Sequence, residues 1–256
     1  MNCHIRMPLL FVGHGNPMNV LDDNKYSHMW ETIGQQLSPP KAIICMSAHW
    51  LTDGSYITSS IHPEMIYDFY GFPQELYDVQ YPAPGDDKLA NKISHSHSFI
   101  KPDAMRGYDH GAWSVLKRMF PKAEAPVLQL SIDYSHSPLA QYSLLQQLKV
   151  LRNEGILFIG SGNIVHNLAL VSMDQKPYDW AIEFEAFCKK SIQNKNINTL
   201  LDYKKIGTIA HLSIPTDDHF RPLLNTLALS YEDEEPIFFN EGIDMGSVSM
   251  LSVMHK

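Results

Sequence analysis

Two histidines near the start of the chain directly follow apolar runs. The run Leu9–Val12 ends in Gly-His-Gly, which places His14 between two glycines, and the run that begins at Ala42 ends at His49. Glycines beside a polar group let the backbone turn tightly and let a ligand approach closely. Neutral imidazole is a common metal ligand. If both runs are strands of one sheet, His14 and His49 lie at the same edge and favour a metal site over two separate structural histidines.

Three more histidines have a comparable context. His110 lies between glycines in GYDHGAW, His166 follows the apolar run 156–159 and the segment GSGN, and His219 follows the apolar run 208–214. Ligands of open α/β sheets bind outside the carboxyl ends of the strands. A single histidine at such a place is more often a hydrogen-bonded structural residue. We expect His211 to be a core or edge residue of a strand, and seven others to be surface or structural residues: His4, His28, His62, His95, His97, His136 and His255.

Several catalytic motifs are absent from the sequence. There is no HExxH and no GxSxG, and GSGN lacks the lysine and the spacing of a phosphate loop, so it predicts a tight strand-to-helix turn. Asp217 and Asp218 could supply a carboxylate ligand, but a solvated helix start beside Arg221 is the favoured interpretation.

The composition limits the class of partner. The chain has 256 residues and a formal net charge of −8, which argues against a nucleic-acid partner or an anionic membrane. No apolar run approaches the ~18 residues of a membrane span. The three cysteines are odd in number and scattered, which disfavours a disulfide framework and a CxxC zinc site and favours the cytoplasm. Cys45 is expected in the core, and the oligomeric state stays open.

The elements that must position the histidines follow from the hydrophobic pattern. Strands are predicted at 9–12, 42–46, 56–59, 127–132, 156–159, 208–214, 237–239 and 248–253. Helices are predicted at 25–37, at 112–120, from the Ser137-Pro138 cap to Gly155, and along the stripe that begins at Trp180. This alternation predicts an α/β fold with a central mixed β-sheet flanked by helices. The segment 61–86, rich in Pro, Gly and Tyr, predicts a long functional loop.

Eight motifs occur in the order found in one known family. They are GHGNP, SAHW, YDFYGFP, YPAPG, YDHGAW, QLSID, GSGNIVHNL and MGSVSMLSV, and they extend from about residue 8 to residue 254. The sequence thereby resembles the class III extradiol ring-cleaving dioxygenases, in their 4,5-DOPA dioxygenase-like branch. The resemblance implies one catalytic α/β domain over residues 1–256, an active site at the strand carboxyl ends, one mononuclear divalent metal, and oxygen-dependent cleavage of a catechol.

The resemblance also implies a role for each of the five histidines. His14, His49 and His219 look like the metal ligands, with His219 where the wider class uses a glutamate. His166 resembles the acid/base residue, which could join the metal in zinc-loaded protein. His110 resembles a histidine that faces oxygen and substrate. Asn16 departs from the family, which more usually has a small hydroxyl residue there.

The reaction implied is the opening of a catechol ring by O2, with DOPA-like or other para-substituted catechols preferred. Fe(II) is expected for activity, and Zn(II) is the alternative in purified protein. A zinc hydrolase and a non-catalytic binding protein remain alternatives, because three histidines and a water also form a familiar zinc site. Four aromatic residues of the long loop are expected at the substrate mouth, and two charged residues are expected to hold a charged substrate tail: Tyr67, Phe69, Tyr70 and Phe72, and Asp68 and Arg221.

Overall fold

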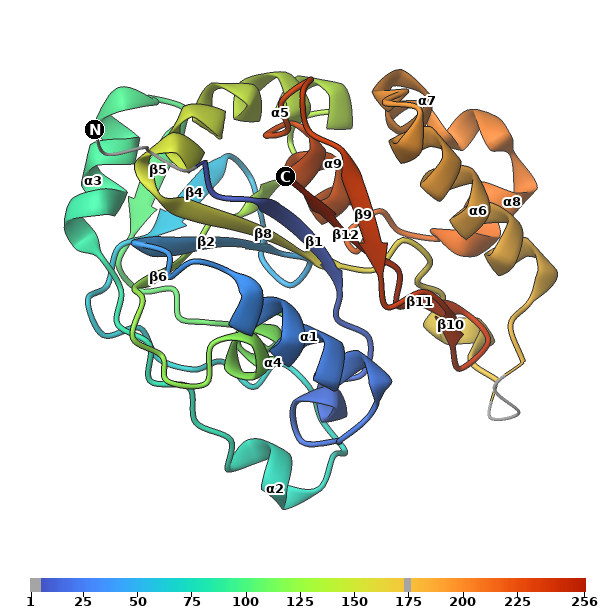
Figure 1. Ribbon diagram of the computed structural model, residues 1–256, viewed down its shortest axis with the longest axis horizontal. Coiled ribbons are helices and arrows are strands. Elements are labelled where there is room, and N and C mark those ends of the chain that lie inside the picture. The colour runs from blue at the N-terminus through green and yellow to red at the C-terminus, as the bar shows by residue number, and fades with distance from the viewer. Residues whose placement is uncertain (1–5, 173–175) are drawn as a thin grey trace.

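A six-stranded sheet forms the centre of the computed structural model, which describes residues 6–172 and 176–256 (Figure 1). Its strand order is β6-β2-β8-β1-β12-β9. The bounds are β1 Leu9–Gly13, β2 Ala42–Ser47, β6 Val127–Gln129, β8 Ile156–Gly162, β9 Pro236–Phe239 and β12 Ser252–His255. The strands β6, β2, β8 and β1 are parallel to one another, β12 is antiparallel to β1, and β9 is antiparallel to β12. The predicted α/β fold with a mixed sheet is confirmed.

Three two-stranded sheets and the helices surround the central sheet. The short strands pair as β3 Leu51–Thr52 with β7 Ile132–Asp133, β4 Ser55–Thr58 with β5 Ile100–Asp103, and β10 Ile243–Asp244 with β11 Val248–Ser249. The α-helices are α1 Lys25–Gln36, α2 Gln74–Tyr77, α3 Asp87–Ser96, α4 His110–Met119, α5 Pro138–Leu145, α6 Asp179–Gln193, α7 Ile197–Leu201, α8 Thr208–Ser213 and α9 Arg221–Leu227. Short 3-10 helices are η1 Pro17–Val20, η2 Gln146–Glu154, η3 Leu168–Leu170 and η4 Tyr203–Ile206. Within the described residues, no helix is long and apolar enough to cross a bilayer.

Both faces of the central sheet are covered, which explains its continuous apolar runs. In β1, Leu10 and Val12 pack with Trp30 of α1 and Trp113 of α4, while Phe11 packs on the opposite face in the cluster that includes α6 and α9. Figure 1 shows α1 and α4 below the sheet and α5 and α9 above it. Alternate residues of one strand therefore enter different cores, and both cores need apolar side chains.

The two glycines of GSGN let other segments come close to β8. A Cβ on Gly160 would lie 2.0 Å from the hydroxyl oxygen of Thr226 in α9, and a Cβ on Gly162 would lie 2.2 Å from the carbonyl oxygen of His219. The strand β8 runs through both glycines to Gly162, and Asn163 then donates its N–H to that same His219 carbonyl at 2.9 Å. The predicted strand-to-helix turn is therefore wrong, because the glycines serve close packing against the strand.

The predicted strand at 208–214 is also wrong. These residues form α8, in which Ala210 and Ser213 are buried at helical spacing, and α8 packs against α6. The β-branched residues in the run favour a strand, but packing of the segment on α6 overrides that weak preference. His211 is consequently exposed on α8 and is not a core or edge residue of a strand. His219 does not follow a strand, since it lies in the loop between α8 and α9.

Most other predicted elements match the structure, with changes at their ends. The helices predicted at 25–37 and 112–120 are α1 and α4, Ser137 caps α5, and η2 ends at Gly155 with φ +93°. The run 127–132 divides into β6 and β7, and the run 248–253 divides into β11 and β12. His4 lies outside the described residues.

A buried ion pair ties the end of η2 to the C-terminal part of the chain. The Arg152 side chain is fully buried and donates to the carbonyl oxygens of Met7 and Leu229 at 2.9 and 2.8 Å. Its guanidinium also makes a two-pronged ion pair with the Glu234 carboxylate, with Nη1 to Oε2 at 2.8 Å. Planar, two-pronged pairs of this kind are the strong ones among charge-assisted hydrogen bonds.

Replacing Glu234 with Gln should lower the free energy of unfolding by about 3–5 kcal/mol at neutral pH, because the buried guanidinium would lose its counter-ion. Urea unfolding measures this change. The matched control is Asp233→Asn. Asp233 is the neighbour of Glu234 in the chain, and its exposed carboxylate pairs with Arg6. The control should leave the unfolding midpoint nearly unchanged, and equal losses in both variants would contradict a special role for the buried pair.

The same pair predicts acid sensitivity. Burial disfavours the charged form of Glu234, but the hydrogen bonds from Arg152 and from the Tyr231 N–H outweigh it, so the pKa of Glu234 lies below its ordinary value of 4.5. A carboxylate with a lowered pKa stabilises the fold above its ordinary pKa and loses that effect as the pH falls through the folded value. Below pH 4.5 the wild-type protein should therefore lose stability more steeply than Glu234→Gln, as measured by urea unfolding at a series of pH values.

Candidate metal centre

Three imidazoles converge at the carboxyl ends of the central strands. His14 directly follows β1, His49 comes two residues after β2, and His219 lies in the α8–α9 loop held against the end of β8. Each offers a ring nitrogen, and the three nitrogens lie within 4.8 Å of one another. The Nε2 atoms of His14 and His49 are 3.4 Å apart. This spacing suits ligands of one metal ion, because metal–nitrogen bonds are about 2 Å long.

The tautomer of His14 follows from its hydrogen bond. Its Nδ1 lies 3.0 Å from the Ser161 hydroxyl oxygen, and that hydroxyl donates its own proton to the Gly111 carbonyl oxygen at 2.5 Å. The Ser161 oxygen must therefore accept from His14, so the proton of the imidazole is on Nδ1. The lone pair on Nε2 is left free, and Nε2 is the atom that approaches His49.

A carboxylate lies against each of the other two imidazoles. Nδ1 of His49 lies 3.3 Å from Asp68, and Nδ1 of His219 is hydrogen-bonded to Asp218 at 2.5 Å. An ionised carboxylate only accepts hydrogen bonds, so His219 carries its proton on Nδ1 and keeps Nε2 free, and the nearby carboxylate of Asp68 favours the same tautomer in His49. An outer hydrogen-bond partner on the second ring nitrogen is the usual support of a metal-ligating histidine.

The environment of Asp218 differs from the solvated helix start that the sequence favoured. It is not part of a solvated helix start, since its carboxylate is partly buried against His219, while Asp217 is the residue that pairs with Arg221, at 3.0 Å. Burial alone would raise the pKa of Asp218, but the hydrogen bond from His219 outweighs it and holds that pKa well below its usual range. Asp218 is thus an ionised acceptor next to the converging imidazoles.

Burial keeps two of the converging imidazoles neutral, those of His14 and His49. The His14 side chain is only 3% exposed, and burial together with the neighbouring histidines His219 and His49 lowers the pKa of His14 well below 6.5. Burial, followed by the positive charge that His110 would carry, also lowers the pKa of His49 well below 6.5. Metal ions bind the neutral form of imidazole, so the site is ready for a cation at neutral pH.

The remaining two candidate histidines flank this group. His166 stacks on His219 with ring centroids 3.5 Å apart, and His110 lies beside His49 with ring centroids 4.0 Å apart. Burial, and to a lesser degree His219, lowers the pKa of His166 to about 3, so its imidazole is neutral. The structure thus brings all five sequence-predicted histidines around one cavity of about 270 Å³.

Asp68 joins two of these histidines from the long loop. One of its oxygens accepts from Nδ1 and from the backbone N–H of His110, at 2.9 and 3.0 Å, and the other lies against His49. Burial would raise the pKa of Asp68, but the side-chain and backbone hydrogen bonds from His110 outweigh it and lower that pKa to about 2. Both oxygens of Asp68 therefore lie against imidazoles. No oxygen of Asp68 is left to bind a charged substrate tail, which is the role that the sequence predicted.

The cavity walls are mostly apolar. Asn16 and Pro17 line one part, and the apolar side chains that line the rest are Phe69, Phe72, Leu168, Met245 and Val248. The predictions for three other residues are wrong. Tyr67 is half-buried against the core and donates to the Val79 carbonyl at 2.7 Å, and Tyr70 is 92% exposed. Arg221 is buried and donates to the carbonyl oxygens of Asp133 and His136.

Sequence reasoning did not identify several residues of this site. It missed Ser161 as the acceptor that orients His14, and it missed the wall residues Leu168, Met245 and Val248. Ser161 lies inside the GSGN segment, so its position beside two glycines at a strand end was the available signal. The wall residues come from η3 and the β10–β11 region, and their signal was that they lie in the motifs GSGNIVHNL and MGSVSMLSV.

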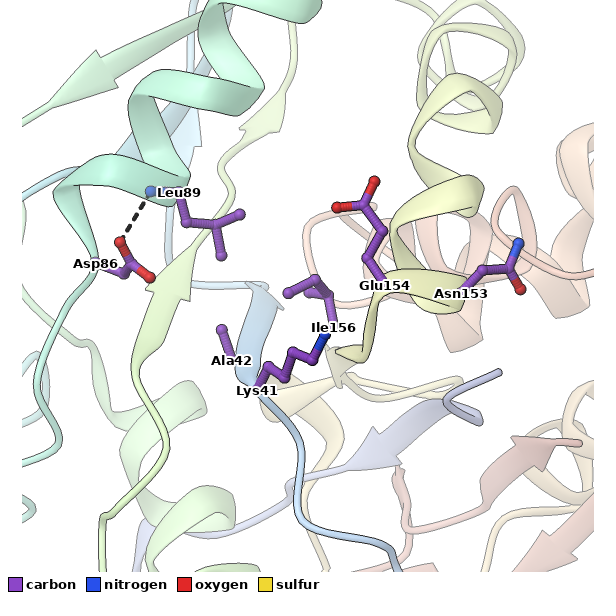
Figure 2. Close-up of a pocket in the computed structure, with 7 residues that line it drawn as sticks. All are labelled: Lys41, Ala42, Asp86, Leu89, Asn153, Glu154 and Ile156. Carbon is purple, nitrogen blue, oxygen red and sulfur yellow. Dashed lines mark hydrogen bonds between the residues drawn. The ribbon is translucent and has the colours of Figure 1, made fainter. Parts of the chain in front are cut away.

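A second cavity lies at the opposite, amino-terminal ends of β2 and β8 (Figure 2). It has about 500 Å³, and its seven lining residues include no histidine or cysteine. Two of its three acidic and basic groups are already engaged, since Asp86 caps α3 at the Leu89 N–H and Glu154 pairs with Lys92. The larger hollow therefore carries no comparable set of ligands.

Comparisons with known proteins point to one family. The family described as the catalytic LigB subunit of aromatic ring-opening dioxygenase matches residues 4–246. A 4,5-DOPA dioxygenase extradiol of Escherichia coli K12 is 44% identical over 97% of this chain and 94% of that protein. A protein of the same name from Beta vulgaris is 33% identical over 93% of this chain and 92% of that protein. A crystal structure of an uncharacterized Escherichia coli K12 protein superposes with a TM-score of 0.85, at 39% identity, and covers 97% of this chain and 99% of that one.

Replacing His14, His49 and His219 together with Ala should abolish stoichiometric metal binding, because the three converging lone pairs would be lost. Metal content per chain is measured after reconstitution and removal of excess ion. The matched control is a triple Ala variant of three exposed histidines, His28, His62 and His211, which should bind metal as the wild type does. A full equivalent of metal in the first variant would place the site elsewhere.

Proposed function

Since the chain belongs to the LigB family of aromatic ring-opening dioxygenases, we propose that it opens a catechol ring beside its two hydroxyls, using one Fe(II) held by His14, His49 and His219. The observation that carries the proposal is the convergence of three imidazole lone pairs in a small cavity with apolar walls. A facial set of three protein ligands leaves positions open for the substrate and for O2. Both oxygen atoms of O2 enter the product, which is a muconic semialdehyde.

The donor set fits a mononuclear divalent metal. Three neutral nitrogens add no charge, so the ion keeps its full 2+ charge for an anionic catecholate. When bound, Fe(II) supplies the redox chemistry by which O2 reacts with the catechol ring. The same three histidines also suit Zn(II), which we propose as an alternative occupant that does not support ring opening.

We propose that His166 is the acid/base residue. Its imidazole lines the cavity, is neutral, and is stacked on His219 without belonging to the group of three converging nitrogens. A neutral imidazole accepts a proton from a catechol hydroxyl and can return it to a developing anionic oxygen. His166 therefore moves the proton, while the other three imidazoles hold the ion.

His110 faces the reacting molecules from the opposite side. Asp68 accepts the Nδ1 proton of His110, so Nε2 of His110 is left for a hydrogen bond to substrate or oxygen. Because the backbone N–H of His110 binds the same carboxylate oxygen, the ring has a fixed orientation. This role is that of a hydrogen-bonding partner and not of a metal ligand.

The cavity favours a single substituted ring as substrate. Phe69 and Phe72 supply aromatic walls, and Asn16 supplies a polar lining group. The side-chain oxygen of Asn16 accepts from the Met18 N–H and so caps η1. Arg221 and the oxygens of Asp68 are engaged elsewhere, so shape and the metal select the catechol. DOPA-like and other para-substituted catechols are our proposed substrates, in line with the names of the relatives.

Anaerobic reconstitution with Fe(II), followed by O2 and a panel of para-substituted catechols, should give stoichiometric oxygen uptake and a yellow product. An oxygen electrode and product absorbance measure the reaction, and Zn(II)-loaded protein is the inactive control. Hydrolysis of esters or amides by the Zn(II) form, with no oxygen uptake by the Fe(II) form, would replace the dioxygenase proposal with a zinc hydrolase. Catechol binding without turnover in either form would instead indicate a binding protein.

His166→Ala should keep its metal and lose turnover, because a general acid/base typically contributes about 10²–10⁴-fold to the rate. Metal content and kcat are measured on the same preparation. His49→Ala is the comparison variant, and it should lose metal as well as turnover. Equal loss of metal in both variants would show that His166 is a structural ligand.

A further inference from the structure

Asp109 is a fully buried carboxylate next to the metal centre but outside its cavity. It precedes His110 and caps α4, where the Ala112 N–H donates to its Oδ1 at 3.2 Å. It also forms a reciprocal pair with the buried Gln129 of β6. The Asp109 N–H donates to the Gln129 side-chain oxygen at 3.0 Å, and the Gln129 amide donates to Asp109 Oδ2 at 2.8 Å.

Two further donors to Asp109 are the groups that hold the backbone of His49. The Ser47 hydroxyl donates to Asp109 Oδ1 at 2.6 Å and accepts from the His49 N–H at 3.2 Å. Nη2 of Arg106 donates to Asp109 Oδ2 at 3.0 Å and to the His49 carbonyl oxygen at 3.1 Å. Both polar groups of the His49 backbone are thus bound by side chains that Asp109 itself orients.

The first turn of α4 also packs directly against His49. A Cβ on Gly111 would lie 2.5 Å from the Ser47 hydroxyl oxygen and 2.8 Å from Cδ2 of the His49 ring. The carbonyl of Gly111 accepts from Ser161, the residue that orients His14. One helical turn therefore contacts the supports of two of the proposed ligands.

We infer that Asp109 is a positioning residue of the metal centre, which sets where His49 stands relative to His14 and His110. The inference rests on the proposed metal site. Capping α4 needs only one acceptor, whereas Asp109 satisfies four donors, two of which also bind the His49 backbone. A buried carboxylate is costly unless it is fully paired, and two of the four donors to Asp109, Ser47 and Arg106, also bind the backbone of His49.

Asp109→Asn tests the inference with little change in volume. The new amide keeps an acceptor for capping but directs two N–H groups at existing donors, so the Ser47 or Arg106 contact must shift. Loss of an outer partner typically weakens metal binding about 10–100-fold, and we expect a Co(II) dissociation constant raised by that factor. The visible spectrum of bound Co(II), which reports ligand geometry, should also change.

The matched control is Asp133→Asn. Asp133 is similarly buried and also accepts several hydrogen bonds, from Gly54, Ser135 and His136, but its carboxylate contacts none of the five site histidines. This variant should lower the thermal unfolding midpoint while leaving the Co(II) dissociation constant and spectrum at their wild-type values. Equal weakening of metal binding in both variants, or unchanged binding in Asp109→Asn, would overturn the inference.

A second variant applies if Asp109→Asn does not fold. Arg106→Met removes the donor that the His49 carbonyl oxygen and Asp109 Oδ2 share, but leaves Asp109 with its Ser47, Ala112 and Gln129 contacts. Loss of the hydrogen bond to the His49 carbonyl, about 1 kcal/mol, corresponds to about a fivefold rise in the Co(II) dissociation constant. An unchanged constant in folded Arg106→Met would overturn the inference, whereas wild-type protein that binds no Co(II) would overturn the proposed metal site together with it.

Discussion

The orientation of three imidazole rings by fixed oxygens is the interaction on which the site depends. Nδ1 of His14 and of His219 is hydrogen-bonded to Ser161 and Asp218, and Nδ1 of His49 lies 3.3 Å from Asp68, so each ring turns its other nitrogen toward the same small volume. Three converging lone pairs repel one another and gain nothing from burial unless a cation joins them. The arrangement is therefore understandable as a metal site and has no comparable explanation as a packed core.

Ser161, Asp68 and Asp218, the groups that lie against the three imidazoles, come from distant parts of the chain. The tertiary fold brings them to one place. Ser161 belongs to β8, which lies between β1 and β2, so it can reach the histidine at the end of β1. Asp68 comes from the long loop, and Asp218 comes from the segment after α8. Close contact between these segments requires glycines at Gly111 and Gly162, where a side chain would collide with the supporting groups.

The same geometry gives the other two histidines positions apart from the converging trio. His166 is stacked parallel to His219 at the cavity wall, which leaves its ring among the site residues but outside the converging trio. His110 is held by Asp68 on the other side, next to His49. The cavity that these histidines line also has aromatic and aliphatic walls.

The sequence by itself determined the parts that depend on local pattern. Continuous apolar runs predicted β1, β2 and β8, and the ends of those runs predicted that His14 and His49 share one edge; Ser137 and Gly155 predicted where a helical segment begins and ends. Eight ordered motifs identified the family before any geometry was available.

Only the tertiary structure decided what depends on distant partners. Thr208–Ser213 became α8 because it packs on α6, and His219 was then held at the site by its contact with β8. Asp68 is an ordinary loop carboxylate in the sequence, and nothing near it shows that the distant imidazoles of His49 and His110 would lie against its oxygens. The hydrophobic pattern of a segment predicts which of its own side chains are buried. The donor that binds a given carboxylate depends on which segments the tertiary fold places beside it.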